Sequence, residues 1–411
     1  MSDKTNNVIN RAYKAFVPSK DELKRLDSVA SYAVRHIKDA AQREKAAINV
    51  NLGGSYAKGT NIVDKSDIDI FVSFDSEKST KLLGKLVPKN FMEQRGTRIY
   101  YRGKIRGIPV EIVPVVRFLS VDKVENSIDL SVLHTEYVRK RLNEDLRKDI
   151  IILKQFCKAN GCYGSETFRH GFSGYSLELL VLHYGGLKPL FSAVSGWRPP
   201  IFIDPGQQYK DKKRALENIN VDGSFLVVID PTNPRRNVCG SLNKENLAKF
   251  VFSVKKFIAH PSIELFKEKD EERIVRITSK KRHTKLFEYS TKIEEPRDRF
   301  LSIYNKSLAK LIDELRKNGV EIYDSTPVYY DKEVKLLLEI ANTPVTSTRR
   351  VDGPEVWLGM DSFKEYLKQH KNSYPHGENA SYDKPYGIKD FKRFIQTKLK
   401  EYIDSKTILK N

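Results

Sequence analysis

Apolar residues recur at helical spacing in the first long element that the chain predicts. The segment Ser19-Lys20-Asp21-Glu22 has the form of a capping box, so we expect the helix to begin there. One face of this helix is apolar. It carries Leu23, Leu26, Val29, Ala30, Ala33, Val34 and Ile37. Runs rich in β-branched and aromatic residues at 48–52 and 68–72 predict two strands. Together these patterns predict an α/β domain at the start of the chain.

The pattern then changes twice along the chain. Residues 136–258 have mainly helical periodicity, and later segments mix the two patterns. We expect strands at 286–289, 320–323 and 334–340, and a helix that is capped by Asp298 and ended by Gly319. A helix at 362–368 and a polar, turn-rich segment at 373–387 should follow. We expect a final helix from about Asp390 to Ile403 to pack back on the preceding strands and helix, which form the body described below. The sequence therefore predicts an α+β multidomain protein. Its parts are a head at 1–135, a helical neck at 136–258, an α+β body at 259–345 and a small tail at 346–411.

Two carboxylates flank an apolar residue at the start of the second predicted strand. Alternate side chains share one face of a strand, so Asp67 and Asp69 point the same way. Two like charges on one face repel unless a cation lies between them. Mg²⁺ binds carboxylate and phosphate oxygens, and two-metal enzymes use such pairs. An Asp-x-Asp pair on its own is more often a solvated pair at a strand end.

A glycine-rich turn precedes this strand. In Gly53-Gly54-Ser55, the glycines permit backbone conformations closed to other residues, and free amides there can cradle phosphates together with the Ser55 hydroxyl and Lys58. The turn is not a Walker loop, because no Gly-Lys-Ser/Thr follows four variable residues. Gly-Gly-Ser alone is a common turn, but its spacing to the aspartates makes the combination specific.

A third acid is expected on a neighbouring strand. Residues 97–105 run to a turn at Arg106-Gly107 and return over 108–114, which predicts a hairpin. Glu111 is the acid of the returning strand and has apolar neighbours, where a charge is costly unless it is paired or bound to metal. The alternative is that Glu111 faces solvent on an edge strand. With the two aspartates in place, we interpret Glu111 as part of the same site.

At this point the chain resembles the class I, archaeal-type CCA-adding enzymes, which are tRNA nucleotidyltransferases of the DNA polymerase β superfamily. The glycine turn and aspartate pair match the superfamily head. Residues 153–164, the Gly171-Phe172-Ser173-Gly174-Tyr175 element and the Asp230-Pro231…Arg236-Asn237-Val238 element narrow the match to this class. The similarity is strong from about Leu52 to Ile258 and weaker beyond. It implies a polymerase-β-like α/β catalytic head, a nucleotide-binding neck, an RNA-binding body and a tRNA-binding tail that is shorter than usual.

The resemblance also implies roles for individual residues. Asp67, Asp69 and Glu111 would be the catalytic metal ligands for two Mg²⁺ ions, although the family more often has aspartate than glutamate at the third position. Arg236 would read the base edge. The residues that would bind the triphosphate are Ser55, Lys58, Ser131, His134, Lys154 and Tyr163.

Each of these residues also has a purely structural interpretation. His134 fits a helix end, Lys154 a solvated helix face and Tyr163 core packing. Arg235 lies beside Arg236, so either is a candidate base reader, although only Arg236 precedes Asn-Val. The ordered set of matches favours the functional interpretation.

Composition agrees with a nucleic-acid partner. Lys and Arg number 73 against 53 Asp and Glu, a net charge of +20, and such an excess attracts polyanions such as tRNA. Basic clusters recur at 210–214, 280–283 and 349–350.

The three cysteines give no disulfide framework or zinc spacing, and the sequence shows no signal peptide or apolar run long enough to span a membrane. We therefore expect a cytoplasmic enzyme.

The predicted activity is template-independent addition of CCA to the 3′ end of tRNA from CTP and ATP, with the acceptor stem bound and pyrophosphate released. The sequence leaves a homodimer open. One rival is another RNA nucleotidyltransferase on the same head, a poly(A) polymerase or an oligoadenylate synthase. The other is a non-catalytic RNA-binding protein with a retired transferase head, although such proteins commonly lose a carboxylate.

Overall fold

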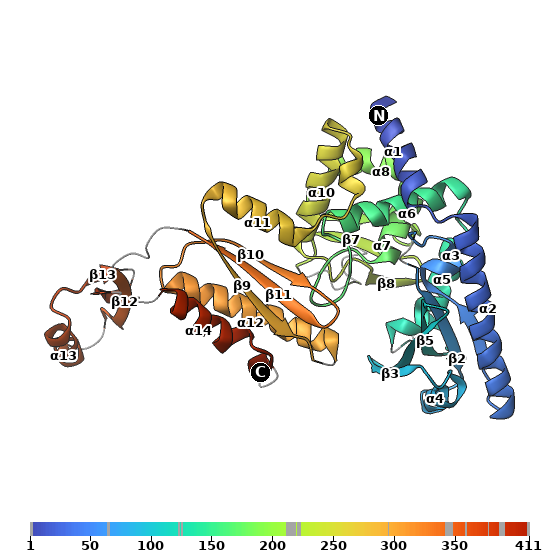
Figure 1. Ribbon diagram of the computed structural model, residues 1–411, viewed down its shortest axis with the longest axis horizontal. Helices are drawn as coiled ribbons and strands as arrows, with labels where there is room; N and C mark the ends of the chain where they lie inside the picture. Colours follow the sequence, from blue (N-terminus) through green and yellow to red (C-terminus); the bar gives the residue numbers. More distant parts are fainter. Residues whose placement is uncertain are drawn as a thin grey trace. The chain divides into compact units, whose positions relative to one another are not determined.

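The chain forms two compact units, residues Met1–Glu268 and Lys269–Asn411 (Figure 1). The computed structural model describes residues 3–63, 66–121, 124, 126–210, 219, 223–294, 296–341, 348–357, 360–376, 378–385 and 391–408. The predicted division at 345/346 lies outside the described residues. The divisions at 135/136 and 258/259 stay predictions.

A five-stranded mixed sheet forms the head of the first unit, with strand order β1-β2-β5-β4-β3. The strands are β1 Asn49–Leu52, β2 Ile68–Phe74, β3 Met92–Arg95, β4 Ile99–Ile105 and β5 Ile108–Val116. β2 and β5 are parallel, whereas the other neighbouring pairs are antiparallel. The predicted strands and hairpin are thus confirmed. The hairpin turns at Arg106 and Gly107, which both have positive φ, as a tight two-residue hairpin turn requires.

Helix α2, Lys20–Arg43, packs its apolar stripe against this sheet (Figure 1). The Ser19 side chain accepts a hydrogen bond from the Glu22 amide, which confirms the predicted cap. The predicted face is buried at most positions, but Leu23 is exposed because it lies in the first turn, outside the core. Short helices α3 Gly54–Lys58 and α4 Leu83–Leu86 and the 3-10 turns η1 Lys78–Leu82 and η3 Ser127–Leu130 complete the head.

The rest of the first unit is mainly helical, as the periodicity predicted. Its helices are α1 Asp3–Phe16, α5 Ser131–Arg139, α6 Glu144–Ala159, α7 Gly174–Tyr184, α8 Leu187–Ser195 and α10 Lys244–Ala259, and the 3-10 turn η4 Ile263–Phe266 follows. A three-stranded sheet that the sequence did not predict lies among them: β6 Ile201–Ile203, β7 Leu226–Asp230 and β8 Asn233–Asn237. The sequence did not predict these strands because they are short, because β7 is buried at every position and so shows no alternation, and because the segments around them have helical periodicity.

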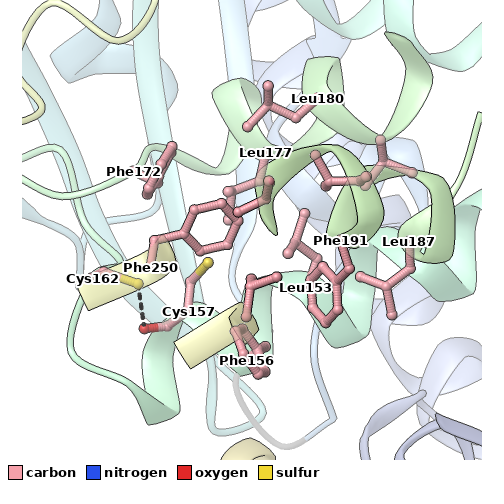
Figure 2. Close-up of a cluster of buried hydrophobic side chains, with 14 of the residues drawn as sticks. Leu153, Phe156, Cys157, Cys162, Phe172, Leu177, Leu180, Leu187, Phe191 and Phe250 are labelled. Carbon is pink, nitrogen blue, oxygen red and sulfur yellow. Dashed lines mark hydrogen bonds between the residues drawn. The ribbon is translucent and has the colours of Figure 1, made fainter. Parts of the chain in front are cut away.

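A buried cluster of leucine, phenylalanine and cysteine side chains holds these helices together. Figure 2 shows Phe156 of α6 packed beside Phe191 of α8, with ring centroids 5.1 Å apart. Cys157 and Cys162 lie in the same cluster as free thiols, and the Cys162 Sγ donates to the Cys157 carbonyl at 3.5 Å. The two cysteines are therefore packing residues.

The second unit contains two small sheets. The first has strand order β10-β11-β9 and the second β12-β14-β13. Their strands are β9 Lys285–Lys292, β10 Ile322–Tyr329, β11 Glu333–Ile340, β12 Thr348–Glu355, β13 Tyr374–His376 and β14 Asn379–Pro385, and the helices are α11 Glu271–Arg282, α12 Arg297–Lys317, α13 Met360–Gln369, α14 Phe391–Ile403 and α15 Ser405–Ile408. The final helix packs back on the body as predicted, because the Thr291 hydroxyl donates to the Ile403 carbonyl at 2.7 Å.

Two expectations for this unit were wrong. Asp298 lies within the first turn of α12, and Pro296 occupies the cap position. The segment predicted as polar and turn-rich contains β13 and β14, because backbone pairing forms a sheet there despite polar side chains. Of the basic clusters, Lys280, Lys281 and Arg282 end α11. Residues 211–214 and the side chains at 349–350 lie outside the described residues.

Candidate functional site

The glycine turn lies directly against the strand that carries the aspartates. The Gly53 amide donates to the Asp69 carbonyl at 2.8 Å. Gly54 begins α3 with φ +60°, and a Cβ there would lie 1.6 Å from the Asp69 Oδ2. Only glycine therefore lets the turn approach the Asp69 carboxylate so closely.

The three predicted acids lie at the start of β2 and at the paired position on β5. Asp69 on β2 and Glu111 on β5 are register partners in parallel strands, so their side chains leave the same face. Asp67 immediately precedes β2. Burial and then the charges of Asp67 and Glu111 raise the pKa of Asp69 to about 7, against the opposite effect of Lys58 and Arg102. The site is thus a concentration of negative charge around the Asp69 carboxylate.

The chemistry of this donor set fits a hard divalent cation. Carboxylate oxygens are the ligands that Mg²⁺ prefers, and a cation would relieve the repulsion that raises the pKa of Asp69. The Glu111 Oε1 pairs with the Arg102 Nε at 3.1 Å, and Arg102 is more than half exposed. Among the residues that the structure describes, no group of three His, Cys, Asp or Glu side chains is already arranged to hold a metal ion. To bind a metal ion, the Glu111 carboxylate would have to release its ion pair with Arg102.

A second cluster lies next to the turn and is built around Glu178 of α7. Its side chain is 0% exposed. The Lys58 Nζ lies 2.6 Å from the Glu178 Oε2, and the Lys154 Nζ lies 2.7 Å from Oε1. The Thr60 hydroxyl donates to Oε1 at 2.8 Å. Burial raises the pKa of Glu178, but Lys154 and Lys58 outweigh it and lower the pKa to about 2, so the carboxylate stays ionised.

A third cluster is built around Asp230, at the end of β7. The Asp230 Oδ2 accepts from the Arg236 Nη1 at 2.8 Å and lies 2.9 Å from the His134 Nε2. The Tyr175 hydroxyl donates to Oδ1 at 3.0 Å, and the Tyr175 ring stacks on His134 with centroids 4.1 Å apart. Burial lowers the pKa of His134, against the opposite effect of Asp230. His134 and Arg236, far apart in sequence, are therefore held by one carboxylate.

The remaining predicted residues lie on the elements that surround these clusters. Ser55 is half-buried in α3, and Ser131 starts α5 one turn before His134. Tyr163 forms an isolated bridge with Phe172. A Cβ on Gly174 would lie 3.2 Å from the Tyr163 hydroxyl and 3.6 Å from the Lys154 Nζ, so both groups lie beside the start of α7.

The sequence interpretation missed Glu178, Asp230, Tyr175 and Thr60 as members of the site. Glu178 had a usable signal, since it is the acid of the otherwise apolar segment Gly174–Tyr184. The same reasoning had selected Glu111. The partners of Asp230 come from α5, α7 and β8, and local spacing does not predict that convergence.

Among the described residues, no helix is long and apolar enough to cross a membrane.

Comparison with known proteins identifies the two parts of the first unit. The family model "Nucleotidyltransferase domain" matches residues 34–151, and "tRNA nucleotidyltransferase, second domain" matches residues 148–267. A solved structure of the Cid1 poly(U) polymerase has a TM-score of 0.51 at 14% identity, over 65% of this chain and 99% of that chain. That likeness supports the polymerase-β-like fold.

Full-length relatives extend the match into the second unit. A CCA-adding enzyme of Nanoarchaeum equitans is 28% identical over 393 residues, 93% of this chain and 94% of that protein. A CCA-adding enzyme of Methanoregula boonei is 30% identical over 386 residues, 89% of this chain and 80% of that protein. The resemblance inferred from the motifs is confirmed: the chain belongs to the family of the archaeal CCA-adding enzymes, which are nucleotidyltransferases.

Proposed function

We propose that the protein adds CCA to the 3′ end of tRNA, taking CTP and ATP without a nucleic-acid template and releasing pyrophosphate. The observation that carries this proposal is the pairing of Asp69 with Glu111 directly beside the Gly54 turn, in a chain of this family. The site offers carboxylates on one side and lysines on the other, as nucleotidyl transfer requires.

Asp67, Asp69 and Glu111 would hold the metal. When bound, two Mg²⁺ ions supply charge neutralisation and alignment for the attacking 3′-hydroxyl and the leaving pyrophosphate. The residues of the chain fix that geometry, because the sheet register places Asp69 beside Glu111 and Gly54 lets the turn close over Asp69. Catalysis then depends mainly on positioning the tRNA end against the α-phosphate.

Cations and hydroxyls near the turn would bind the triphosphate. Lys58 has the closest link to the carboxylate site, since its charge lowers the pKa of Asp69. Lys154 and Tyr163 both lie beside Gly174 at the start of α7. The proposed triphosphate-binding set is Ser55, Lys58, Ser131, His134, Lys154 and Tyr163.

Arg236 would select the base. Its bond to Asp230 uses one of the five N–H donors of the guanidinium, and the planar group then presents the others in a fixed direction. The bond to Asp230 therefore supports a base-reading role for Arg236. The neighbouring Arg235 is exposed, whereas Arg236 is half-buried beside the Asp230 cluster.

The net charge of +20 supports a tRNA partner, with the 3′ end and acceptor stem as the expected contacts and the cytoplasm as the expected compartment. In this proposal the head at 1–135 is catalytic, the neck at 136–258 binds nucleotide, and the body and tail bind RNA. The molar mass in solution will show whether the protein acts as a homodimer.

The test is replacement of an acid at each end of β2. Asp67→Ala should abolish nucleotide addition and leave tRNA binding intact. Asp75 immediately follows β2 and pairs with Arg117 at the surface, so Asp75→Ala is the matched control and should retain activity. Normal CCA synthesis by Asp67→Ala would reject the assigned metal site. Addition of adenosine alone to any RNA by the unaltered protein would favour the poly(A) polymerase alternative.

A further inference from the structure

One buried carboxylate connects the glycine turn of the head to two helices of the second family domain. Lys58 ends the short helix α3 that the turn begins, and Thr60 lies two residues further on, whereas Lys154 lies on α6 and Glu178 on α7. All four side chains are buried, and Glu178 contacts the other three. The position of the turn therefore depends on a group outside the nucleotidyltransferase domain match, which ends at residue 151.

The two lysines in this cluster differ in how their donors are used. Lys154 Nζ contacts Glu178 Oε1 at 2.7 Å, Thr60 Oγ1 at 2.9 Å and the Thr60 carbonyl at 3.3 Å. An ammonium has three N–H donors, so these contacts occupy all of them. Lys58 has a single hydrogen bond among the described residues, to Glu178 at 2.6 Å. Within the described part of the chain, Lys58 thus has N–H donors left for a further ligand, and its Nζ also lies 6.0 Å from the centroid of the Tyr175 ring.

The location of Lys58 indicates what that ligand is. Lys58 ends the five-residue helix α3, and Gly54 at the start of the same helix abuts the Asp69 carboxylate, so Lys58 lies near the carboxylate site. Its side chain is 8% exposed, which excludes most water and strengthens interactions with an arriving anion. Two ammoniums buried together would repel each other without Glu178, and leaving them unpaired would be costly. Glu178, which contacts both ammonium groups, therefore offsets the repulsion between them.

We propose that Glu178 is a positioning residue that holds the Lys58 ammonium beside the carboxylate site for the nucleotide triphosphate, with Lys154 and Thr60 fixing Glu178 in turn. This inference rests on the proposed nucleotide-transfer function. It adds that the phosphate-binding cation of the head is aligned by a residue of the second domain. Glu178 itself need not touch the nucleotide.

A double-mutant cycle distinguishes this role from a general contribution to folding. Glu178→Gln should raise the KM for CTP and ATP by roughly 10- to 100-fold, the range expected for a lost charge-assisted hydrogen bond, and leave tRNA affinity unchanged. Lys58→Met should have a similar effect. If Glu178 acts through Lys58, the KM of the double variant for CTP and ATP should match the KM of Lys58→Met to within about twofold. Effects that multiply would overturn the proposal, as would an unchanged KM in folded Glu178→Gln.

Two further variants keep the test decisive. Glu178→Asp retains the charge on a shorter side chain and should give an intermediate KM, and it replaces Glu178→Gln in the cycle if the latter does not fold. Glu339→Gln is the matched control: Glu339 is also buried, 1% exposed, and accepts hydrogen bonds from the Arg282 guanidinium and the Thr284 hydroxyl. Its nucleotide KM should stay at the unaltered value. An equal rise in KM for Glu339→Gln would overturn the proposal by attributing the effect to lost stability.

Equilibrium binding of CTP with Mg²⁺ separates failure of the proposed function from failure of the positioning role. If the unaltered protein neither binds CTP nor extends tRNA, the proposed function fails. If it does both and the effects in the cycle multiply, only the role of Glu178 is overturned.

Discussion

Asp69 on β2 and Glu111 on β5 are direct register partners in parallel strands, and their side chains leave the same face of the head sheet. The Gly54 turn closes against Asp69, and the Lys58 charge acts on the same carboxylate. This relationship places a group of carboxylates next to the positive charge of Lys58.

The approach of the turn to Asp69 should depend on glycine. Gly54→Ala places a Cβ where the Asp69 Oδ2 lies, so we expect activity to fall about 100-fold or more through misplacement of the carboxylate. Gly185→Ala is the control, because Gly185 also has positive φ, +74°, but no atom of the described residues lies within 4 Å of a Cβ added there. Steady-state kinetics of both variants provide the measurement. Equal losses would show that backbone strain, and not the contact with Asp69, is responsible.

Metal binding should release a proton at low pH. Burial and the neighbouring acids raise the pKa of Asp69 to about 7, and a ligating carboxylate must be deprotonated. The apparent Mg²⁺ affinity should therefore rise by about tenfold per pH unit below pH 7 and level off above it. Isothermal titration calorimetry in buffers of different ionisation enthalpy will measure the protons released. Affinity that is the same at pH 6 and pH 8 would contradict this prediction.

The same shift predicts how stability responds to pH in metal-free protein. Because the pKa of Asp69 is higher in the folded state than its usual 3.8, the folded state binds more protons between about pH 4 and pH 7. The contribution of this group to the free energy of unfolding therefore falls as pH rises through that window. Asp69→Asn should gain stability relative to the unaltered protein as pH rises from about 4 to about 7, as measured by thermal unfolding in EDTA. A difference in stability between the two proteins that stays constant across this pH range would contradict the prediction.

Base selection should depend on Arg236. Removing its guanidinium in Arg236→Ala should lower discrimination between CTP and ATP by roughly 10- to 100-fold, the range for a lost charge-assisted contact, and affect triphosphate affinity less. Arg235→Ala removes the same charge from the neighbouring position and should preserve selection. Competition between the two nucleotides on tRNA ending at each step will measure this ratio. Unchanged selection in Arg236→Ala would reject the role.

Local signals in the sequence predicted the head well. The Ser19 cap, the strand that follows Asp67 and the hairpin at Arg106-Gly107 each depend on a few adjacent residues, and all three are present. The placement of Glu111 beside Asp69 was also expected, because an acid with apolar neighbours in a strand needs a partner.

The parts that the sequence did not predict depend on contacts between distant segments. Glu178 gathers Lys58 and Lys154 from two different elements, and Asp230 gathers His134 and Arg236. No periodicity encodes which buried cation a buried acid will meet. The strands β13 and β14 were missed for a related reason, since backbone pairing and not an apolar pattern defines them.

The most direct test of the central claim is to incubate tRNA that lacks its 3′ CCA with Mg²⁺ and with CTP, ATP or both, and then to sequence the 3′ ends. We predict cytidines alone with CTP, a complete CCA with both nucleotides, and loss of all addition in Asp67→Ala. A run of adenosines from ATP alone, 2′–5′ linked products, or extension that survives Asp67→Ala would contradict the claim.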